Sequence, residues 1–210
     1  MLGKKSILLG SLFICVSLQA KVYQENFESL KLGSIPKSWK VVSAWETQKF
    51  TQAPSGEKVF SMKDNKKGFL GFGSGFNLAF TKAIPFKDGE ISVKFHANSG
   101  RIDQGGGIIW RVKDKDNYYV ARFNPLEDNF RFYKVIDGSR SELKSANVKL
   151  SKAWHSMKII QKEDHFEGYL DDEKILDAYD DSIQQSGGVG LWTKADAKTS
   201  FDDFVVKSGK

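Results

Sequence analysis

The side chains best suited to chemistry gather in one stretch of the sequence, residues 107–136, where aromatic residues alternate with arginines and asparagines. An aromatic ring stacks on the C–H face of a sugar, while arginine and asparagine donate hydrogen bonds to its hydroxyl groups. Alternating apolar positions and turn-forming residues predict three consecutive strands here, at residues 108–112, 118–124 and 129–136. Saccharide binding would require the polar and aromatic side chains to share one face of this sheet.

The lengths of the connecting loops suggest how these strands pair. A four-residue loop at 125–128, rich in turn formers, places Asn124 opposite Asn129. One face then collects side chains typical of a core, namely Ala121, Phe123, Phe130 and Phe132. Continuing the register through the first loop places Val112 opposite Tyr118. The other face is predicted to bind a ligand through Trp110, Tyr118, Arg122, Asn124, Asn129, Arg131 and Tyr133.

The predicted register sets two arginines, Arg122 and Arg131, directly opposite each other. Opposed like charges destabilise a sheet, so something anionic or hydrogen-bonding is expected between them. In one interpretation that group is a bound saccharide. In the alternative, Glu127, Asp128 or a carboxylate from another strand neutralises the pair, and the aromatic residues simply cover the sheet.

Catalytic residues cannot be assigned from the sequence. The acids that can be placed near the predicted face are Glu127, Asp128 and Asp196, and they show no spacing typical of a glycosidase carboxylate pair. The three histidines are not spaced as zinc ligands on one element. Whether the protein is an enzyme is therefore left open.

The rest of the chain indicates a fold built from strands. Short alternating runs recur at 91–95, 154–161, 166–170, 174–179, 189–193 and 201–206, and helical periodicity is not evident after residue 20. The 19 glycines, 16 phenylalanines and 5 tryptophans suit turns and large aromatic cores. We expect a single all-β domain at 21–210, a sandwich or a barrel.

The first twenty residues have the layout of a secretory signal peptide. Lys4 and Lys5 precede an apolar run at 6–17, and Ala20 offers a small residue for cleavage. The run is shorter than the roughly 20 apolar residues of a spanning helix. We expect removal of residues 1–20, a periplasmic or secreted protein, and membrane contact only before cleavage. The alternative is a retained membrane anchor.

The distribution of charge bears on the binding partners, and the cysteine content bears on how the fold is stabilised. The net charge of +6 comes from interleaved signs with no block of like charge, which argues against a nucleic-acid partner. Cys15 is the single cysteine and lies in the expected signal peptide. The mature domain is therefore expected to be held by its core without disulfides.

Five segments carry a resemblance to a known family. They are residues 105–111 (GGGIIWR), 116–124 (DNYYVARFN), 154–155 (WH), 188–196 (GVGLWTKAD) and 201–204 (FDDF). In this order they resemble the concanavalin A-like lectin/glucanase superfamily, and most closely its laminin-G-like jelly rolls grouped with the 3-keto-disaccharide hydrolases. The resemblance spans most of residues 22–207. It implies a two-sheet antiparallel jelly-roll sandwich with one concave sheet.

Two departures from these relatives bear on activity. The chain lacks the Glu-x-Asp-x-(x)-Glu strand of family-16-type glycoside hydrolases, and Val120 stands where the keto-disaccharide branch tends to carry an acid. The missing acids and the predicted aromatic, arginine and asparagine face, together with the expected signal peptide, favour an exported, lectin-like protein whose partner is a saccharide. The alternatives are a glycoside hydrolase-like enzyme of the 3-keto-disaccharide type and an envelope interaction protein that binds no sugar.

The resemblance also implies a structural calcium ion, because similar jelly rolls often hold one between the first and last strands. Glu28 near the start and Asp202 and Asp203 near the end match that placement, and calcium prefers carboxylate and carbonyl oxygens. In the alternative, these acids face solvent or cap turns. No other cofactor is expected.

Overall fold

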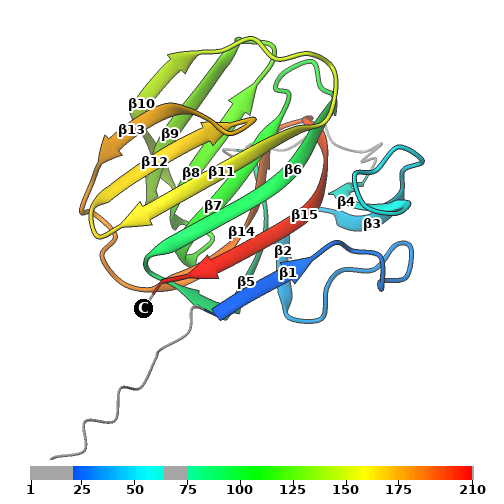
Figure 1. Cartoon of the computed structure of the whole chain (residues 1–210), viewed down its shortest axis with the longest axis horizontal. Coiled ribbons are helices and arrows are strands. Elements are labelled where there is room, and N and C mark those ends of the chain that lie inside the picture. Colours follow the sequence, from blue (N-terminus) through cyan, green and yellow to red (C-terminus); the bar gives the residue numbers. More distant parts are fainter. Residues whose placement is uncertain (1–20, 64–74, 210) are drawn as a thin grey trace, which may run out of the picture.

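The computed structural model describes residues 21–63 and 75–209, and all of the regular structure in these ranges is β-strand (Figure 1). One sheet contains β1 (Lys21–Glu25), β3 (Trp45–Lys49), β4 (Lys58–Met62), β6 (Gly89–Ser99), β11 (His155–Lys162), β12 (His165–Leu170), β13 (Glu173–Tyr179) and β15 (Lys198–Ser208). The other contains β2 (Trp39–Val42), β5 (Phe76–Phe86), β7 (Gly106–Asp114), β8 (Asn117–Asn124), β9 (Asn129–Ile136), β10 (Ser139–Asn147) and β14 (Gly187–Lys194).

The two sheets form an antiparallel sandwich of the jelly-roll type, as predicted. The 8-stranded sheet runs β13-β12-β11-β6-β15-β4-β3, with β1 added beside β15, and the 7-stranded sheet runs β10-β9-β8-β7-β14-β5-β2. Strands distant in sequence, such as β6 and β15, lie side by side (Figure 1). Every strand in the described ranges belongs to one of these sheets.

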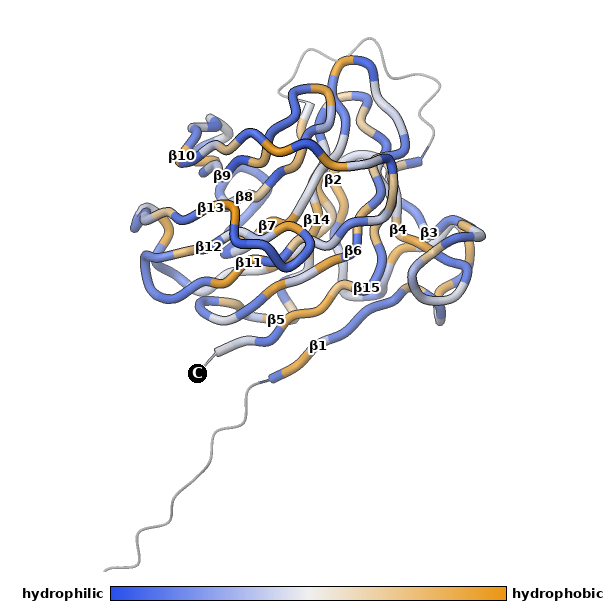
Figure 2. The backbone as a smooth tube through the Cα atoms, turned by 45° about the horizontal axis from the view of Figure 1, so that its top comes forward, coloured by the Kyte–Doolittle hydropathy of each residue, from blue (hydrophilic) through white to orange (hydrophobic). Residues whose placement is uncertain are grey.

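The core lies between the sheets and is rich in aromatic rings. Trp110 stacks on Tyr119 with ring centroids 5.6 Å apart, and Phe132 meets Phe166 of the opposite sheet edge-on at 5.0 Å. Offset and edge-to-face pairs of this kind add to the stabilisation from burial. Apolar and polar residues alternate along the strands, as Figure 2 shows, because successive side chains point to opposite faces.

The predicted pairing of the second and third strands is confirmed. β8 and β9 place Asn124 opposite Asn129 and Arg122 opposite Arg131. The predicted core side of this hairpin, with Phe123, Phe130 and Phe132, is buried between the sheets. A short polar loop and strict alternation were sufficient to determine this register.

The predicted pairing of the first strand is wrong by one residue. Ile108 lies opposite Ala121 and Trp110 opposite Tyr119, so Trp110 points into the core, where its Nε1 donates to Oε1 of Gln161 at 2.7 Å. The register shifts beyond Trp110, where Arg111 adopts a φ of 48°. A bulge of this kind inserts extra residues in one strand and reverses the faces of those before it.

The expected signal peptide, residues 1–20, lies outside the described residues. Within the described ranges no helix has the length and apolar character needed to cross a membrane.

Candidate functional site

The side of the 7-stranded sheet that faces away from the core, here called the outer face, carries most of the predicted site residues. An apolar cluster separate from the main core lies on it, made of Leu78, Phe80, Ile109, Val112, Tyr118, Val120, Tyr133, Val135 and Trp192. The tryptophan of this outer-face cluster is Trp192 of β14, and not Trp110 as the sequence predicted. Its Nε1 donates to the hydroxyl of Tyr118 at 3.2 Å. Both rings are fully buried, so neither is an open plate for stacking.

Arg122 is held by carboxylates from two loops. Its Nη2 lies 3.0 Å from Oδ1 of Asp103 and 3.4 Å from Oε1 of Glu127, and its side chain is 2 % exposed. Asp103 is itself buried and lies 3.6 Å from Nζ of Lys194. Asp196 fixes this loop by accepting the backbone N–H groups of residues 101–103. Arg122 is therefore part of a buried ion-pair network.

Glu127 lies between the two opposed arginines. Its Oε2 is 3.3 Å from Nη1 of Arg131, while its other oxygen contacts Arg122. The side-chain amide of Asn129 donates to Glu127 at 2.9 Å. This hydrogen bond, followed by the bonds and charges of the two arginines, lowers the pKa of Glu127 to about 2. The alternative in which a carboxylate neutralises the arginine pair is thus the arrangement found.

The remaining predicted residues also have structural partners. The amide of Asn124 donates to Asp103 at 3.2 Å, and its oxygen accepts the backbone N–H of Leu126 in the turn. Burial raises the pKa of Tyr118. Arg131 is the most open of the predicted set, with 30 % side-chain exposure, and its Nη1 donates to the hydroxyl of Tyr133. Their roles in ligand binding stay predictions.

Arg140 of β10 is a residue of this face that the sequence interpretation missed. Its guanidinium carbon lies 4.2 Å from the ring centroid of Tyr133, a distance typical of a cation–π contact. The Asp137-Gly138 turn was a usable signal, because a two-residue hairpin there fixes β10 against β9. That pairing sets Arg140 opposite Val135 and hence on the outer face.

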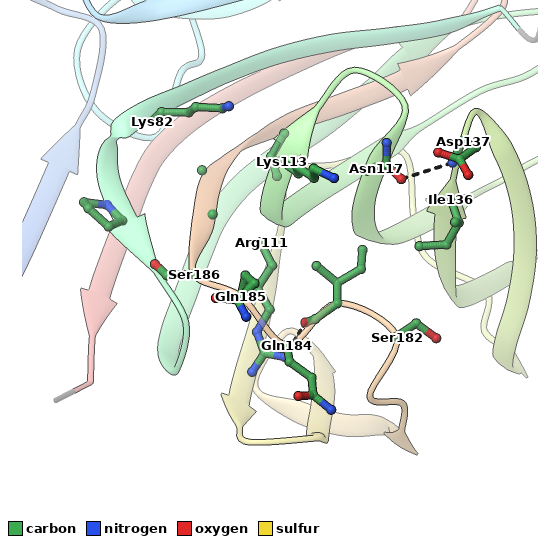
Figure 3. A pocket seen from close by; sticks show the side chains of 15 residues that line it. Lys82, Arg111, Lys113, Asn117, Ile136, Asp137, Ser182, Gln184, Gln185 and Ser186 are labelled. Atoms are coloured by element: carbon green, nitrogen blue, oxygen red, sulfur yellow. Dashed lines mark hydrogen bonds between the residues drawn. The ribbon is translucent and has the colours of Figure 1, made fainter.

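A pocket of about 560 Å³ opens at one end of the 7-stranded sheet (Figure 3). Its walls come from β5, β7, the β9–β10 hairpin and the segment between β13 and β14. The register between β14 and its neighbours β5 and β7 shifts at this end, and so does that between β7 and β8. Bulges often occur beside binding sites, where they open the sheet and re-aim side chains.

Arg111 fixes the wall of this pocket. Its side chain is 1 % exposed, and its Nη1 donates to the carbonyl of Ile183 at 2.8 Å and its Nε to that of Lys87 at 2.9 Å. Gly187 follows in the same wall, where a Cβ would lie 2.4 Å from the backbone carbon of Arg111. The close approach of the two chains therefore requires glycine.

The pocket presents polar groups that are not used elsewhere. Within the described residues, the side chains of Lys82, Lys113, Gln184 and Gln185 make no hydrogen bond or ion pair, and all four are exposed. Asp137 is the single carboxylate of the lining, and its backbone N–H donates to Oδ1 of Asn117 at 3.1 Å (Figure 3). The pocket offers amide and ammonium donors but one carboxylate, which does not match the carboxylate pair that glycoside hydrolysis requires.

The predicted calcium ligands converge on one loop. Oε1 of Glu28 accepts backbone N–H groups of Glu57 and Lys58, while Asp202 and Asp203 both bond the hydroxyl of Ser55. Burial raises the pKa of Asp202 to about 6. No cationic side chain of the described residues forms an ion pair with it. A buried carboxylate without a counter-charge fits a cation chemically, and calcium binding stays a prediction.

A different group of three residues has side-chain atoms close enough together to bind one metal ion. In the described ranges His165, Glu167 and Asp177 are the one such group whose ligand atoms all lie within 4.8 Å of one another. Nζ of Lys174 lies 3.0 Å from Glu167 and 2.9 Å from Asp177. An ammonium group thus already neutralises these carboxylates.

The two-sheet jelly roll, with a neutralised outer face and a polar pocket at its end, places this chain among the concanavalin A-like sandwiches. More specifically, it belongs to the family described as the 3-keto-alpha-glucoside-1,2-lyase-like domain, whose model matches residues 35–207. Both the predicted superfamily and the predicted family branch are confirmed.

Individual relatives agree with this assignment. A levanase of Bacillus subtilis (strain 168) is 26 % identical over 192 residues, which cover 86 % of this chain but 26 % of the levanase. The chain therefore spans about a quarter of the length of that relative.

Solved structures of low identity show the same fold. The carbohydrate binding module CBM66 from Bacillus subtilis superposes with a TM-score of 0.65 at 20 % identity, covering 81 % of this chain and 96 % of the module. A beta-glucanase of Bacillus licheniformis gives a TM-score of 0.59 at 12 % identity, covering 92 % of this chain and all (100 %) of that chain.

Proposed function

We propose that this protein is exported, binds a saccharide and does not hydrolyse it. Family membership, the levanase relative and the fold shared with a carbohydrate binding module support a saccharide as the ligand. Fold alone does not determine function, so the choice between binding and hydrolysis rests on the state of the carboxylates.

The observation that carries this choice is that the carboxylates around the two opposed arginines are ion-paired with them. Asp103 pairs with Arg122, Glu127 with both Arg122 and Arg131, and Glu142 with Arg131 at 3.3 Å. Glycoside hydrolysis needs one carboxylic acid that keeps its proton near neutral pH and a second carboxylate beside the scissile bond. For Glu127, the hydrogen bond from Asn129 and the pairing with arginine lower the pKa, which favours the ionised form instead.

The pocket and the adjoining outer face supply the binding surface in this proposal. Gln184 and Gln185 offer amide donors and acceptors, and Lys82 and Lys113 offer ammonium donors, and none of these side chains forms a hydrogen bond or ion pair within the described residues. Val112 and Ile136 add apolar wall that suits sugar C–H groups. A few directed polar groups on an apolar wall are typical of small-ligand pockets.

Isothermal titration with levan, the substrate that gives the levanase its name, and with a panel of other neutral glycans tests the proposal, while released sugar is assayed in the same samples. We expect binding of at least one glycan without release. Gln184→Ala combined with Gln185→Ala should weaken binding, whereas Gln52→Ala, an exposed glutamine outside the pocket lining, should not. Binding of no glycan would favour the envelope interaction alternative.

The family description supports a second candidate, a lyase acting on 3-keto-glucosides. Such an elimination removes the C2 proton, which the neighbouring ketone acidifies, and breaks the C1–O bond. The released alkoxide takes up a proton from the protonated base or from water, so one base is sufficient. Asp137, an exposed carboxylate without an ion-pair partner in the described residues, is the candidate base of the pocket. Appearance of a conjugated enone from a 3-keto-glucoside, and its loss in Asp137→Asn, would establish this activity in place of simple binding.

A further inference from the structure

Arg140 lies across three aromatic rings of the outer face. Its guanidinium carbon is 4.2 Å from the ring centroid of Tyr133, 5.5 Å from that of Phe76 and 5.9 Å from that of Trp192. These rings come from β9, β5 and β14, so three strands position one side chain. Arg140 remains partly exposed at this position.

Unlike its neighbours, Arg140 has no carboxylate partner in the described residues. Arg122 is paired with Asp103 and Glu127, and Arg131 is paired with Glu127 and Glu142. The Nη1 atom of Arg140 is buried and makes no hydrogen bond. Buried donors are nearly always satisfied in folded proteins, so this one calls for an explanation.

The aromatic rings explain the position of the guanidinium but not its unsatisfied donor. Ring faces attract a cation through their quadrupole, yet they supply no lone pair for the N–H groups. The hydroxyl of Tyr133 accepts a hydrogen bond from Nη1 of Arg131. A guanidinium that is fixed in place, charged and without an acceptor is preorganised for an anionic ligand.

Arg140 lies on the outer face, which adjoins the pocket. It lies opposite Val135, whose side chain belongs to the outer-face apolar cluster, whereas the next residue of β9, Ile136, packs against the main core. Val112 belongs both to that outer-face cluster and to the pocket lining. The outer face therefore meets the pocket at Val112, and a saccharide of more than one residue can occupy both.

We propose that Arg140 binds a carboxylate of the ligand, so that the preferred saccharide is acidic, of the uronic-acid type. The inference rests on the proposed saccharide-binding function and adds the ligand class. A carboxylate matches the planar fork of arginine through two parallel hydrogen bonds, which neither a neutral hydroxyl nor a lysine reproduces.

The test compares the affinities of three acidic polysaccharides, polygalacturonate, polyglucuronate and alginate, with those of their carboxyl-reduced neutral forms. At least one acidic polymer should bind tighter than its neutral form by on the order of tenfold, as expected for hydrogen bonds to charged groups. Arg140→Met should abolish this preference and Arg140→Lys should retain part of it. Lys144→Met removes an exposed cation of the same strand and should change nothing.

The outcomes separate this inference from the proposed function. If neutral glycans bind and no acidic form binds more tightly, saccharide binding stands and the role of Arg140 is wrong. If no glycan of either kind binds, both proposals fail. If Arg140→Met keeps the acidic preference while its thermal melt matches that of the wild type, the carboxylate is recognised elsewhere. If Arg140→Met does not fold, the Arg140→Lys variant decides. An undiminished preference of Arg140→Lys for the acidic polysaccharide would contradict the proposal that arginine binds the carboxylate through two hydrogen bonds.

Discussion

Arg122 and Arg131 face each other across β8 and β9, and the carboxylate of Glu127 spans the gap, 3.4 Å from Nη2 of Arg122 and 3.3 Å from Nη1 of Arg131. The turn that joins the two strands thus supplies its own counter-charge. The repulsion expected of opposed arginines becomes a network that ties the turn to the sheet. In the proposed function, groups outside this network bind the ligand.

The first prediction concerns the acid sensitivity of this network. The pKa of Glu127 falls from its ordinary value of 4.5 to about 2 on folding, so its ionised form stabilises the fold above about pH 4.5. That contribution should decline as pH falls toward 2. Glu127→Gln should lower the free energy of unfolding at pH 7 by about 1 kcal/mol or less, because the side chain is half-exposed and screened.

Urea unfolding between pH 7 and pH 2 measures this difference. The wild type and Glu127→Gln should converge as the pH falls, while Glu173→Gln, at an exposed carboxylate without an ion pair in the described residues, should parallel the wild type throughout. A constant gap between wild type and Glu127→Gln across the range would show that Glu127 does not act through its charge.

The second prediction concerns the side of the 7-stranded sheet on which Trp110 lies. Trp110 and Phe132 are both fully buried between the sheets, so Trp110→Ala and Phe132→Ala should each cost about 3–5 kcal/mol of unfolding free energy. Leu126→Ala, at a side chain 51 % exposed, should stay within about 0.5 kcal/mol. A stable Trp110→Ala variant that loses only glycan binding would place Trp110 on the outer face after all.

The third prediction concerns calcium. If Glu28, Asp202 and Asp203 hold the ion, excess Ca²⁺ should raise the melting temperature relative to EGTA. A ligand at one hundred times its dissociation constant adds about 2.7 kcal/mol when it binds only the folded state. Asp202→Asn should abolish the shift, and Asp181→Asn, at an exposed acid away from the loop, should preserve it. Equal melting temperatures of the wild type in Ca²⁺ and in EGTA would show that the protein does not bind calcium at this site.

The fourth prediction concerns export. Expression of the full chain should yield a mature protein that begins at or near Lys21 in the periplasm or medium, because residues 1–20 have the layout of a signal peptide. Intact-mass measurement and N-terminal sequencing check this directly. Recovery of a chain that begins at Met1 in the membrane fraction would support the retained anchor instead.

The sequence was sufficient for those features that depend on alternation and short loops. The pairing of Asn124 with Asn129 follows from a four-residue loop, and both the jelly-roll architecture and the family assignment are confirmed. The face of Trp110 could not be obtained in this way, because the bulge at Arg111 leaves no mark in the alternation.

Contacts between segments far apart in the sequence could not be predicted either. Asp103 reaches Arg122 only because Asp196, more than ninety positions later, holds its loop. The same holds for the pocket, whose wall depends on Arg111 bonding the carbonyl of Ile183, 72 positions away. Sequence spacing cannot show which loops the sandwich brings together at one end.

An NMR titration of the mature, isotopically labelled protein with levan oligosaccharides and the acidic oligosaccharides tests the central claim most directly, because it detects binding and product in one sample. The account predicts that the side-chain amide signals of Gln184 and Gln185 shift with saturation, that those of Gln52 do not, and that the sugar signals stay unchanged for hours. New reducing-end or enone signals would contradict binding without cleavage, and saturating shifts that leave Gln184 and Gln185 unmoved would contradict the pocket.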